Sequence, residues 1–267
     1  MGKGRNITDH SLSCMALLIV PTYNEIENLE RLVTEILLQP VPVHVVVVDD
    51  NSPDGTGELA DRLAAERSDG AESRLSVIHR PAKLGLGTAY VAGFRRALDM
   101  GYGYAITMDA DFSHQPSYLP GLVQLMENHD VAIGSRYVPG GGATGCTPSR
   151  ILMSRGANAL ARAVLGLKAR DCTAGFRCYK TEVLRSIELE TIFSNGYSFL
   201  VETITRCERR GYAIGELPII FHNRRLGKSK ISRVEILKSF YTILRLRFAW
   251  LPWDRLIAMV KRQSQVR

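Results

Sequence analysis

The chain has 267 residues, of which 45% are hydrophobic and 23% charged, and it carries a formal net charge of +7. This length and composition fit one large α/β domain, or one domain with a small appendage, and exclude a chain dominated by low-complexity sequence. The five cysteines include no CxxC pair, which argues against a disulfide framework and a structural zinc site, so we expect buried, reduced thiols.

The positive charge is concentrated at the end of the chain. Residues 224–267 hold 12 Lys or Arg and 2 Asp or Glu, which leaves the preceding residues with a net charge of −3. Leu, Phe and Trp are interleaved with these basic residues, a pattern that suits an anionic membrane face or an anionic substrate. A solvated helix face is the alternative interpretation. No nucleic-acid-binding motif accompanies the pattern, so we do not expect nucleic acid as a partner.

No segment of the sequence predicts a crossing of the bilayer. The polar start "MGKGRNITDHSLS" lacks the apolar core of a secretory signal. The longest candidate, "YTILRLRFAWLPW", is interrupted by Arg245 and Arg247 and is shorter than the roughly 18 to 20 residues that span a membrane. We therefore expect a cytoplasmic protein.

Strands and helices are expected to alternate along the first half of the chain. Short apolar runs rich in β-branched residues predict strands buried on both faces, as in a parallel sheet, and apolar residues at helical spacing separate them. The expected elements are strands at 15–20, 43–48, 75–79, 104–108 and 130–134, with helices near 29–37, 57–66 and 87–100 and one more before the last strand. This alternation predicts a doubly wound α/β domain.

The second half of the sequence is less regular. "GSRYVPGGGATGCTPSR" at 134–150 is a glycine-rich loop that is too long for a simple connection. "YAIGELPIIFHNR" at 212–224 predicts a strand or a bent hairpin. Helices are expected near 150–165, 197–211 and 232–248, and no linker divides the chain into two domains.

Polar motifs follow three of the predicted strands. "PTYNE" begins at Pro21, "DDNSPDGT" at Asp49 and "DADFSH" at Asp109. Ligands of open α/β sheets bind in the crevice beyond the carboxyl ends of the strands. Three strand ends therefore point to one predicted site.

The DxD motif is the strongest indication of chemistry. Asp109 and Asp111 are two residues apart, so their side chains lie on the same side of an extended strand. Their oxygens can share one Mg²⁺ or Mn²⁺ ion that also binds a substrate diphosphate and acts as a Lewis acid. A solvated turn is the alternative.

The other two motifs offer groups for a nucleoside. A carboxylate of Asp49 or Asp50 can accept hydrogen bonds from a nucleobase or a ribose. "PTYNE" places Tyr23 and Glu25 where a strand becomes a helix, a position at which polar residues also serve as caps. Turn and capping roles are the alternatives for both motifs.

Basic side chains near the crevice suit phosphate, because a guanidinium group binds phosphate through two hydrogen bonds. Arg136 follows the fifth strand and Arg150 ends the glycine-rich loop. A further cluster in a late loop contains Arg224, Arg225, Lys228 and Lys230. The alternative interpretation is that each of these residues is a surface charge that binds no ligand.

Two glycine-containing motifs depart from the nucleotide-binding motifs that they partly match. "GLGTAY" is not GxGxxG, because Tyr90 occupies the last position, and "GKS" at 227–229 lacks the first glycine of a phosphate loop. A Rossmann dehydrogenase and a P-loop NTPase are therefore poor fits. No Ser-His-Asp or Cys-His arrangement supports a hydrolase.

Taken together, the motifs resemble those of the inverting GT-A glycosyltransferases of family two. The segments that carry the resemblance are "VPTYNEIENLERLV", "VVVVDDNSPDGT", "MDADFSHQP", "GSRYVPGG", "DCTAGFRCYK" and "YSFLVETITRCERRGYAIGELPIIFHNRRLGKSKIS". They cover nearly the whole chain, from about residue 15 to 248. The last segment is specific to polyprenol-phosphate sugar transferases, and the chain resembles dolichol-phosphate or polyprenol-phosphate mannosyltransferases in particular.

The resemblance implies a single GT-A, Rossmann-like domain that binds GDP-mannose and Mg²⁺ or Mn²⁺ and transfers mannose to a polyprenyl phosphate. Matched by motif, the nucleotide-binding residues would be Pro21, Tyr23, Glu25, Asp49, Asp50 and Asp109. The metal ligands would be Asp109, Asp111 and Ser113, and the residues at the acceptor phosphate Arg136, Arg150, Arg225, Ser229 and Lys230. Asp111 and Arg136 are the expected catalytic residues.

Ser113 departs from the family pattern, in which glutamine is often a further metal ligand. Serine is shorter, so either water replaces that ligand or the metal is held less tightly.

Three regions are expected from this resemblance. They are a disordered polar N-terminus at 1–14, the catalytic domain at 15–231 and a basic amphipathic region at 232–267. The last region contains Trp250 and Trp253, and it would lie at the cytoplasmic face of a membrane and bring the site to the lipid phosphate. Family members without transmembrane helices rely on partner subunits, so a membrane-anchored partner is expected too.

The expected reaction is an in-line attack of the lipid phosphate on the anomeric carbon, which displaces GDP and inverts the configuration. A phosphate is anionic at neutral pH and needs no strong base, so the protein would position the reactants and stabilise the departing diphosphate. Two alternatives remain. One is transfer of glucose or another sugar from a UDP-sugar to a lipid phosphate, and the other is a non-catalytic module that binds a nucleotide sugar or tethers a membrane.

Overall fold

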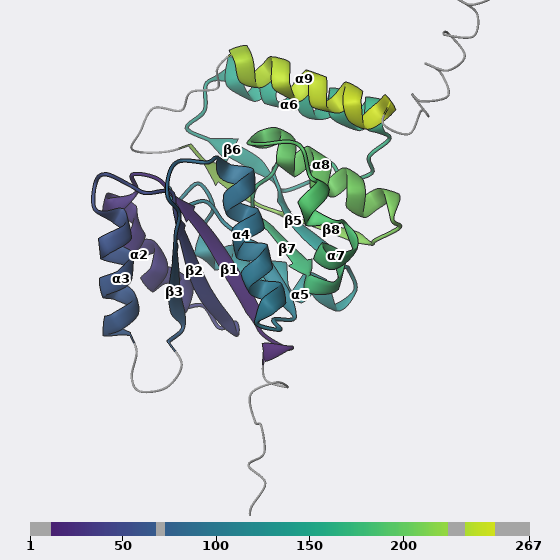
Figure 1. Ribbon diagram of the computed structural model, residues 1–267. Coiled ribbons are helices and arrows are strands. Elements are labelled where there is room, and N and C mark those ends of the chain that lie inside the picture. The colour runs from purple at the N-terminus through teal and green to yellow at the C-terminus, as the bar shows by residue number, and fades with distance from the viewer. Residues whose placement is uncertain (1–11, 68–72, 224–232, 249–267) are drawn as a thin grey trace, which may run out of the picture.

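A seven-stranded sheet lies at the centre of the computed structural model, which describes residues 12–67, 73–223 and 233–248 (Figure 1). The strand order is β3-β2-β1-β4-β7-β5-β8. Neighbouring strands are parallel except β7, which is antiparallel to both β4 and β5. The strands are β1 (Ala16–Thr22), β2 (Val43–Asp49), β3 (Leu75–His79), β4 (Tyr104–Thr107), β5 (Val131–Ser135), β7 (Arg177–Lys180) and β8 (Ile214–Pro218). The predicted mostly parallel sheet is confirmed.

Helices cover both faces of this sheet (Figure 1). Leu17 and Ile19 of β1 share one core with α4 and α8, whereas Leu18 and Val20 share the other with α2 and α5. Successive side chains of a strand point to opposite faces, so burial of both faces explains the continuous apolar runs. The helices are α2 (Ile26–Leu37), α3 (Thr56–Glu66), α4 (Leu86–Asp99), α5 (Leu119–Gln124), α6 (Pro148–Leu165), α7 (Thr181–Ser186), α8 (Tyr197–Arg209) and α9 (Arg233–Phe248), with short 3-10 helices η1 (Pro116–Tyr118), η2 (Leu125–Glu127) and η3 (Leu189–Thr191).

Two expectations for the second half of the chain are wrong. The described residues 212–223 of the predicted 212–224 segment form neither one strand nor a hairpin, because β8 pairs with β5 whereas β9 (Ile220–His222) pairs with β6 (Gly142–Thr144) in a separate two-stranded sheet. The glycine-rich segment therefore contains a strand and is not wholly a loop. The physical reason is that the backbone of β6 finds its hydrogen-bond partners about 78 residues later in the chain, which no local pattern reveals.

The expectation of buried thiols holds for only part of the cysteines. No disulfide joins the five, all of which lie in the described part of the chain. Cys172, Cys178 and Cys207 are buried, whereas Cys14 is exposed and Cys146 partly exposed.

The topology brings several segments to one edge of the sheet. The carboxyl ends of β1, β2, β4 and β5 meet there. Because β7 runs in the opposite direction, the residues that precede it reach the same edge. Helices α6 and α9 lie along one another at the top of Figure 1, with Ile243 and Leu246 of α9 buried. A site at this edge can therefore draw on residues from both halves of the chain.

The close contact of α4 with β1 gives a stability prediction. A Cβ at Gly93 would lie 2.5 Å from Cγ2 of Ile19, so G93A should lower the free energy of unfolding by about 1–3 kcal/mol. Gly156, inside α6, has no such neighbour within 4 Å. G156A should therefore raise the free energy of unfolding by about 0.5–1 kcal/mol through helix propensity. Urea unfolding of both variants measures this, and changes of the same sign would contradict it.

Candidate active site

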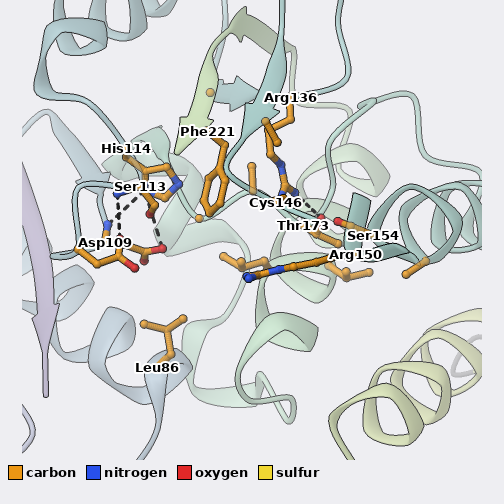
Figure 2. Close-up of a pocket in the computed structure, with 18 of the residues that line it drawn as sticks. Leu86, Asp109, Ser113, His114, Arg136, Cys146, Arg150, Ser154, Thr173 and Phe221 are labelled. Atoms are coloured by element: carbon orange, nitrogen blue, oxygen red, sulfur yellow. Dashed lines mark hydrogen bonds and ion pairs between the residues drawn. The ribbon is translucent and has the colours of Figure 1, made fainter. Parts of the chain in front are cut away.

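A cavity of about 700 Å³ lies at the carboxyl edge of the sheet (Figure 2). Figure 2 shows Asp109, Ser113 and His114 on one side of it and Arg136 and Arg150 on the other. Apolar side chains make up much of the remaining lining and come chiefly from α6, α8 and α9 together with the start of α4. They include Leu86, Ile151, Met153, Leu160, Leu200, Val201, Phe240 and Ile243. The cavity thus combines carboxylates, cations and an extended apolar wall.

The DxD segment enters this cavity with a strained backbone. Asp109, Asp111 and Ser113 all line the cavity. Phe112 has φ of 57°, and the turn lets the backbone N–H of Ser113 donate to Oδ1 of Asp111 at 3.0 Å. A bulky residue in the left-handed region costs about 1–3 kcal/mol, and such strain concentrates at functional sites. The strain at Phe112 therefore supports a functional role for the segment.

Asp109 is positioned by a tyrosine of α4. The hydroxyl of the buried Tyr90 donates to Oδ1 of Asp109 at 3.1 Å. Burial, and next the charge of Asp109, raise the pKa of Tyr90 well above its ordinary value, so Tyr90 remains a hydrogen-bond donor. Sequence analysis singled out Tyr90 only as a mismatch to a glycine motif.

His114 lies beside the same carboxylate. Its Nδ1 accepts a hydrogen bond from the backbone N–H of Asp109 at 3.3 Å, and its ring stacks on Phe176. Burial lowers the pKa of His114 and outweighs the charges of Asp109 and Asp111, which would raise it. The imidazole is therefore neutral near pH 7, in agreement with Nδ1 as an acceptor.

Ser113 has an unusual hydroxyl group. The residue is 1% exposed, and its Oγ is buried without a hydrogen-bond partner among the described residues. A buried hydroxyl that lacks a partner is costly, so its position beside two carboxylates indicates a place for a ligand or an ion. Within residues 12–67, 73–223 and 233–248 no three His, Cys, Asp or Glu side chains converge to hold a metal by themselves. An ion here would need oxygen atoms from a substrate or from water as well.

The two aspartates that follow β2 have different surroundings. Asp49 lies behind the cavity wall, is 2% exposed, and accepts hydrogen bonds from Oγ1 of Thr22 and from the N–H and Oγ of Ser52. Asp50 lines the cavity and forms a 2.6 Å ion pair with Arg80, a residue that sequence analysis missed. Burial raises the pKa of Asp50 against the opposing charge of Arg80. Asp50 is thus the carboxylate that faces the cavity, and Asp49 shapes the loop.

The loop after β1 supplies a second part of the wall. Pro21, Tyr23 and Glu25, for which a nucleotide-binding role was predicted, line the cavity. Nζ of Lys83 lies 3.7 Å from the centre of the Tyr23 ring, and Nδ2 of Asn28 donates to Glu25. Lys83 also lines the cavity and is a cation that sequence analysis did not consider.

Arg136 is locked to a buried aspartate. Its Nε and Nη2 donate to Oδ2 and Oδ1 of Asp171 at 2.7 and 2.8 Å, and Nη2 also donates to Oγ1 of Thr173. Asp171 is fully buried. Burial alone would raise the pKa of Asp171, but the hydrogen bonds and charge of Arg136 outweigh it and hold that pKa below its ordinary value. The guanidinium group of Arg136 is therefore fixed in orientation, and its charge is matched.

Arg150 reaches the cavity from the start of α6. Its Nη1 donates to Oδ1 of Asn223 at 2.9 Å. Arg136 and Arg150, predicted from separate motifs, are thus brought to one cavity. Arg225, Ser229 and Lys230, which were predicted to bind the acceptor phosphate, lie outside the described residues.

The profile of the family described as glycosyl transferase family 2 matches residues 17–188. The chain belongs to this family of glycosyltransferases. It is 44% identical over 228 residues to a polyprenol monophosphomannose synthase of Mycolicibacterium smegmatis, covering 85% of this chain and 84% of the relative. It is 48% identical over 216 residues to an undecaprenyl-phosphate mannosyltransferase of Micrococcus luteus, covering 81% and 87%.

Solved structures confirm the GT-A fold of this glycosyltransferase. Glucosyl-3-phosphoglycerate synthase from Mycobacterium tuberculosis, in complex with Mn²⁺, UDP and glucosyl-3-phosphoglycerate, superposes with a TM-score of 0.60 at 20% identity. The match covers 87% of this chain and 79% of that one. The same enzyme with Mg²⁺ and UDP gives a TM-score of 0.60 at 21% identity. At this low sequence identity, the similarity shows a shared fold and nothing about substrate or activity.

The buried Arg136–Asp171 pair should make the stability of this glycosyltransferase depend on pH. The pKa of Asp171 is lowered from 3.8, so the pair stabilises the folded protein above about pH 4, and this contribution is lost as the pH falls through the folded-state pKa. D171N should lower the free energy of unfolding at pH 7 by about 3–5 kcal/mol, because Arg136 is left without its carboxylate. The difference from the wild type should shrink in acid, as urea unfolding across pH measures.

The matched control for this prediction is D130N. Asp130 pairs with Lys180 at 2.8 Å, but both side chains are more than a quarter exposed. D130N should therefore cost no more than about 1 kcal/mol. Equal losses in D171N and D130N, or a D171N effect that is the same at every pH, would contradict the assignment.

Proposed function

We propose that this glycosyltransferase transfers mannose from GDP-mannose to a polyprenyl monophosphate with inversion, giving polyprenyl-phosphate mannose and GDP. The names of the two relatives support the sugar and the acceptor class. The observation that carries the proposal is the single cavity in which carboxylates and arginines adjoin an apolar wall from α6, α8 and α9. A polyprenyl phosphate has a phosphate head and an apolar chain, and such a cavity suits both parts.

Asp109, Asp111 and Ser113 would hold the divalent ion. The buried Oγ of Ser113, which has no hydrogen-bond partner among the described residues and lies beside two carboxylates, fits Mg²⁺ or Mn²⁺, because these ions prefer oxygen ligands and keep some from substrate or water. When bound, the ion supplies a Lewis acid that stabilises the charge on the departing diphosphate. The nucleoside would lie against Pro21, Tyr23, Glu25 and Asp50, in the loop that Asp49 shapes.

The remaining chemistry is positioning of two anionic reactants. An oxygen lone pair of the acceptor phosphate forms a bond to the anomeric carbon while the bond from that carbon to the diphosphate oxygen breaks, and GDP leaves with the electron pair. No proton has to be removed, which agrees with a neutral His114 whose Nδ1 is already an acceptor. Arg136, held by Asp171, and Arg150 would orient the acceptor phosphate and reduce the repulsion between the reactants.

The proposal places the enzyme at the cytoplasmic face of a membrane, where the apolar acceptor chain resides. No described helix is both long and apolar enough to cross a bilayer. The basic region at 232–267 would keep the enzyme at this surface, although the structure describes only its α9 part. A membrane-anchored partner subunit remains a prediction.

The decisive test offers the purified protein labelled GDP-mannose or UDP-glucose with a polyprenyl phosphate in detergent and Mn²⁺ or Mg²⁺. We expect lipid-linked sugar from GDP-mannose only, and none after chelation of the metal. D111A should lose at least about 100-fold in rate while unfolding like the wild type, because an ion that stabilises the leaving group supplies several kcal/mol. Product from UDP-glucose would favour the UDP-sugar alternative. Metal-independent nucleotide binding without product would favour the non-catalytic one.

Tyr90 gives a prediction that does not require turnover. Y90F removes the hydroxyl that orients Asp109, and loss of such a supporting hydrogen bond typically weakens metal binding by about 10- to 100-fold. We expect Mn²⁺ affinity in the presence of GDP, measured by calorimetry, to fall at least about tenfold. Y212F, at a tyrosine that does not line the cavity, should bind Mn²⁺ as the wild type does. An unchanged Mn²⁺ affinity in Y90F would argue against Asp109 as a metal ligand.

A further inference from the structure

A second cavity of about 590 Å³ adjoins the first and shares Arg136, Tyr137 and Arg155 with it. Its other walls are the loop after β5, the helix α6 and the segment that follows α6. We call it the arginine basin after Arg136, Arg155, Arg162 and Arg170, all of which line it. Arg136 belongs to both cavities, whereas Arg162 and Arg170 line the basin alone, so the basin extends beyond the reaction site.

The charge in the arginine basin is unbalanced. Among the described residues, four guanidinium groups line it and no carboxylate does. Asp171 matches Arg136, but the ion pairs found within the described residues include none of the other three arginines. Nε of Arg162 is buried and has no hydrogen-bond partner in the described part of the chain. Like charges around one cavity repel each other, so an anion in the basin would stabilise this arrangement.

The positions of these arginines are built into the fold. Arg155, Asn158 and Arg162 are three to four residues apart on α6 and therefore share one face. Asn158 is buried, and its Oδ1 accepts from the N–H of Cys172 at 2.9 Å while its Nδ2 donates to the carbonyl oxygen of Arg170. This amide fastens the segment that carries Arg170 to α6. Two hydrogen bonds between the Asn158 side chain and the backbone thus hold this wall of the basin in place.

The surface beside the arginine basin indicates what the anion belongs to. Leu152 of α6, three residues before Arg155, is 73% exposed and does not line the first cavity. On α9, which lies along α6 in Figure 1, Tyr241 is exposed and also lies outside the lining of the first cavity. Large apolar side chains interleaved with arginines are typical of helices that lie in the interface of a bilayer. A soluble phosphate would account for the arginines but not for the apolar surface.

We propose that the arginine basin binds the phosphate group of an anionic phospholipid that does not react, while α6 and α9 lie on the bilayer. The bound lipid would fix the position of the protein on the membrane, with the first cavity next to the membrane surface. The inference goes beyond the proposed reaction and does not require it, because the binding can be measured without a sugar donor or an acceptor.

The test compares binding of the full chain to vesicles of phosphatidylcholine alone with binding to vesicles of phosphatidylcholine and phosphatidylglycerol in equal parts. R162Q/R170Q changes two residues that line only the basin. R62Q/R96Q is the control, since it removes the same charge from exposed arginines of α3 and α4. The basic residues at 224–267 remain in every variant. Co-sedimentation should show at least about tenfold weaker binding to anionic vesicles for R162Q/R170Q and a change of about twofold or less for the control.

Three outcomes would overturn the proposal. Equal losses in both double variants would show a general attraction of net charge, and no loss in either would show that the basin does not touch the membrane. A third outcome is that pyrophosphate raises the Tm of the wild type but not of R162Q/R170Q, while both proteins bind vesicles equally. This outcome would show that the basin binds a soluble anion. Arg170 is exposed, so R170Q alone serves if the double variant does not fold. We expect R162Q/R170Q to transfer mannose in detergent at the wild-type rate. Its loss of vesicle binding can then be distinguished from a failure of the proposed reaction.

Discussion

The negative charge of Asp109 and Asp111 at the end of β4 is the constraint around which the cavity is organised. The contacts of these carboxylates within the described residues include the hydroxyl of Tyr90 and the backbone N–H of Ser113. Two arginines at or near the cavity are paired with acids, Arg136 with Asp171 and Arg80 with Asp50. The cavity thus presents carboxylate oxygens of Asp109 and Asp111, while the cations Lys83, Arg150 and Arg155 lie elsewhere on its wall. This is the arrangement that a divalent ion and a diphosphate together would complete.

The fold supplies that arrangement by bringing strand ends together. Parallel strands deliver the loops after β1, β2, β4 and β5 to one edge, and the reversed β7 delivers Thr173 to the same place. Arg136 and Asp171 are 35 residues apart in sequence and meet only because β7 lies between β4 and β5. Helices α6 and α9 then add the apolar wall. The reactive groups come from the sheet edge, and the surface that suits a lipid comes from the helices above it.

Sequence patterns predicted what depends on local periodicity and failed where distant residues pair. Buried parallel strands are recognisable because both faces need apolar residues, and DxD is recognisable because alternation in a strand places both carboxylates together. The partners of the polar residues are not recognisable in this way. Neither the pairing of Asp50 with Arg80 nor the donor role of Tyr90 follows from any local motif, since each depends on packing between elements. The β6–β9 pair escaped prediction for the same reason, and Asp49 and Asp50 could be told apart only by which of them faces the cavity.

A crystal structure with GDP and Mn²⁺, in which anomalous scattering locates the metal, would show whether Asp109 and Asp111 bind the ion. We expect one manganese ion in contact with carboxylate oxygens of Asp109 or Asp111 and with the diphosphate of GDP, with Asp50 and Tyr23 near the nucleoside. A diphosphate bound elsewhere, or manganese found only at sites remote from these two carboxylates, would contradict it.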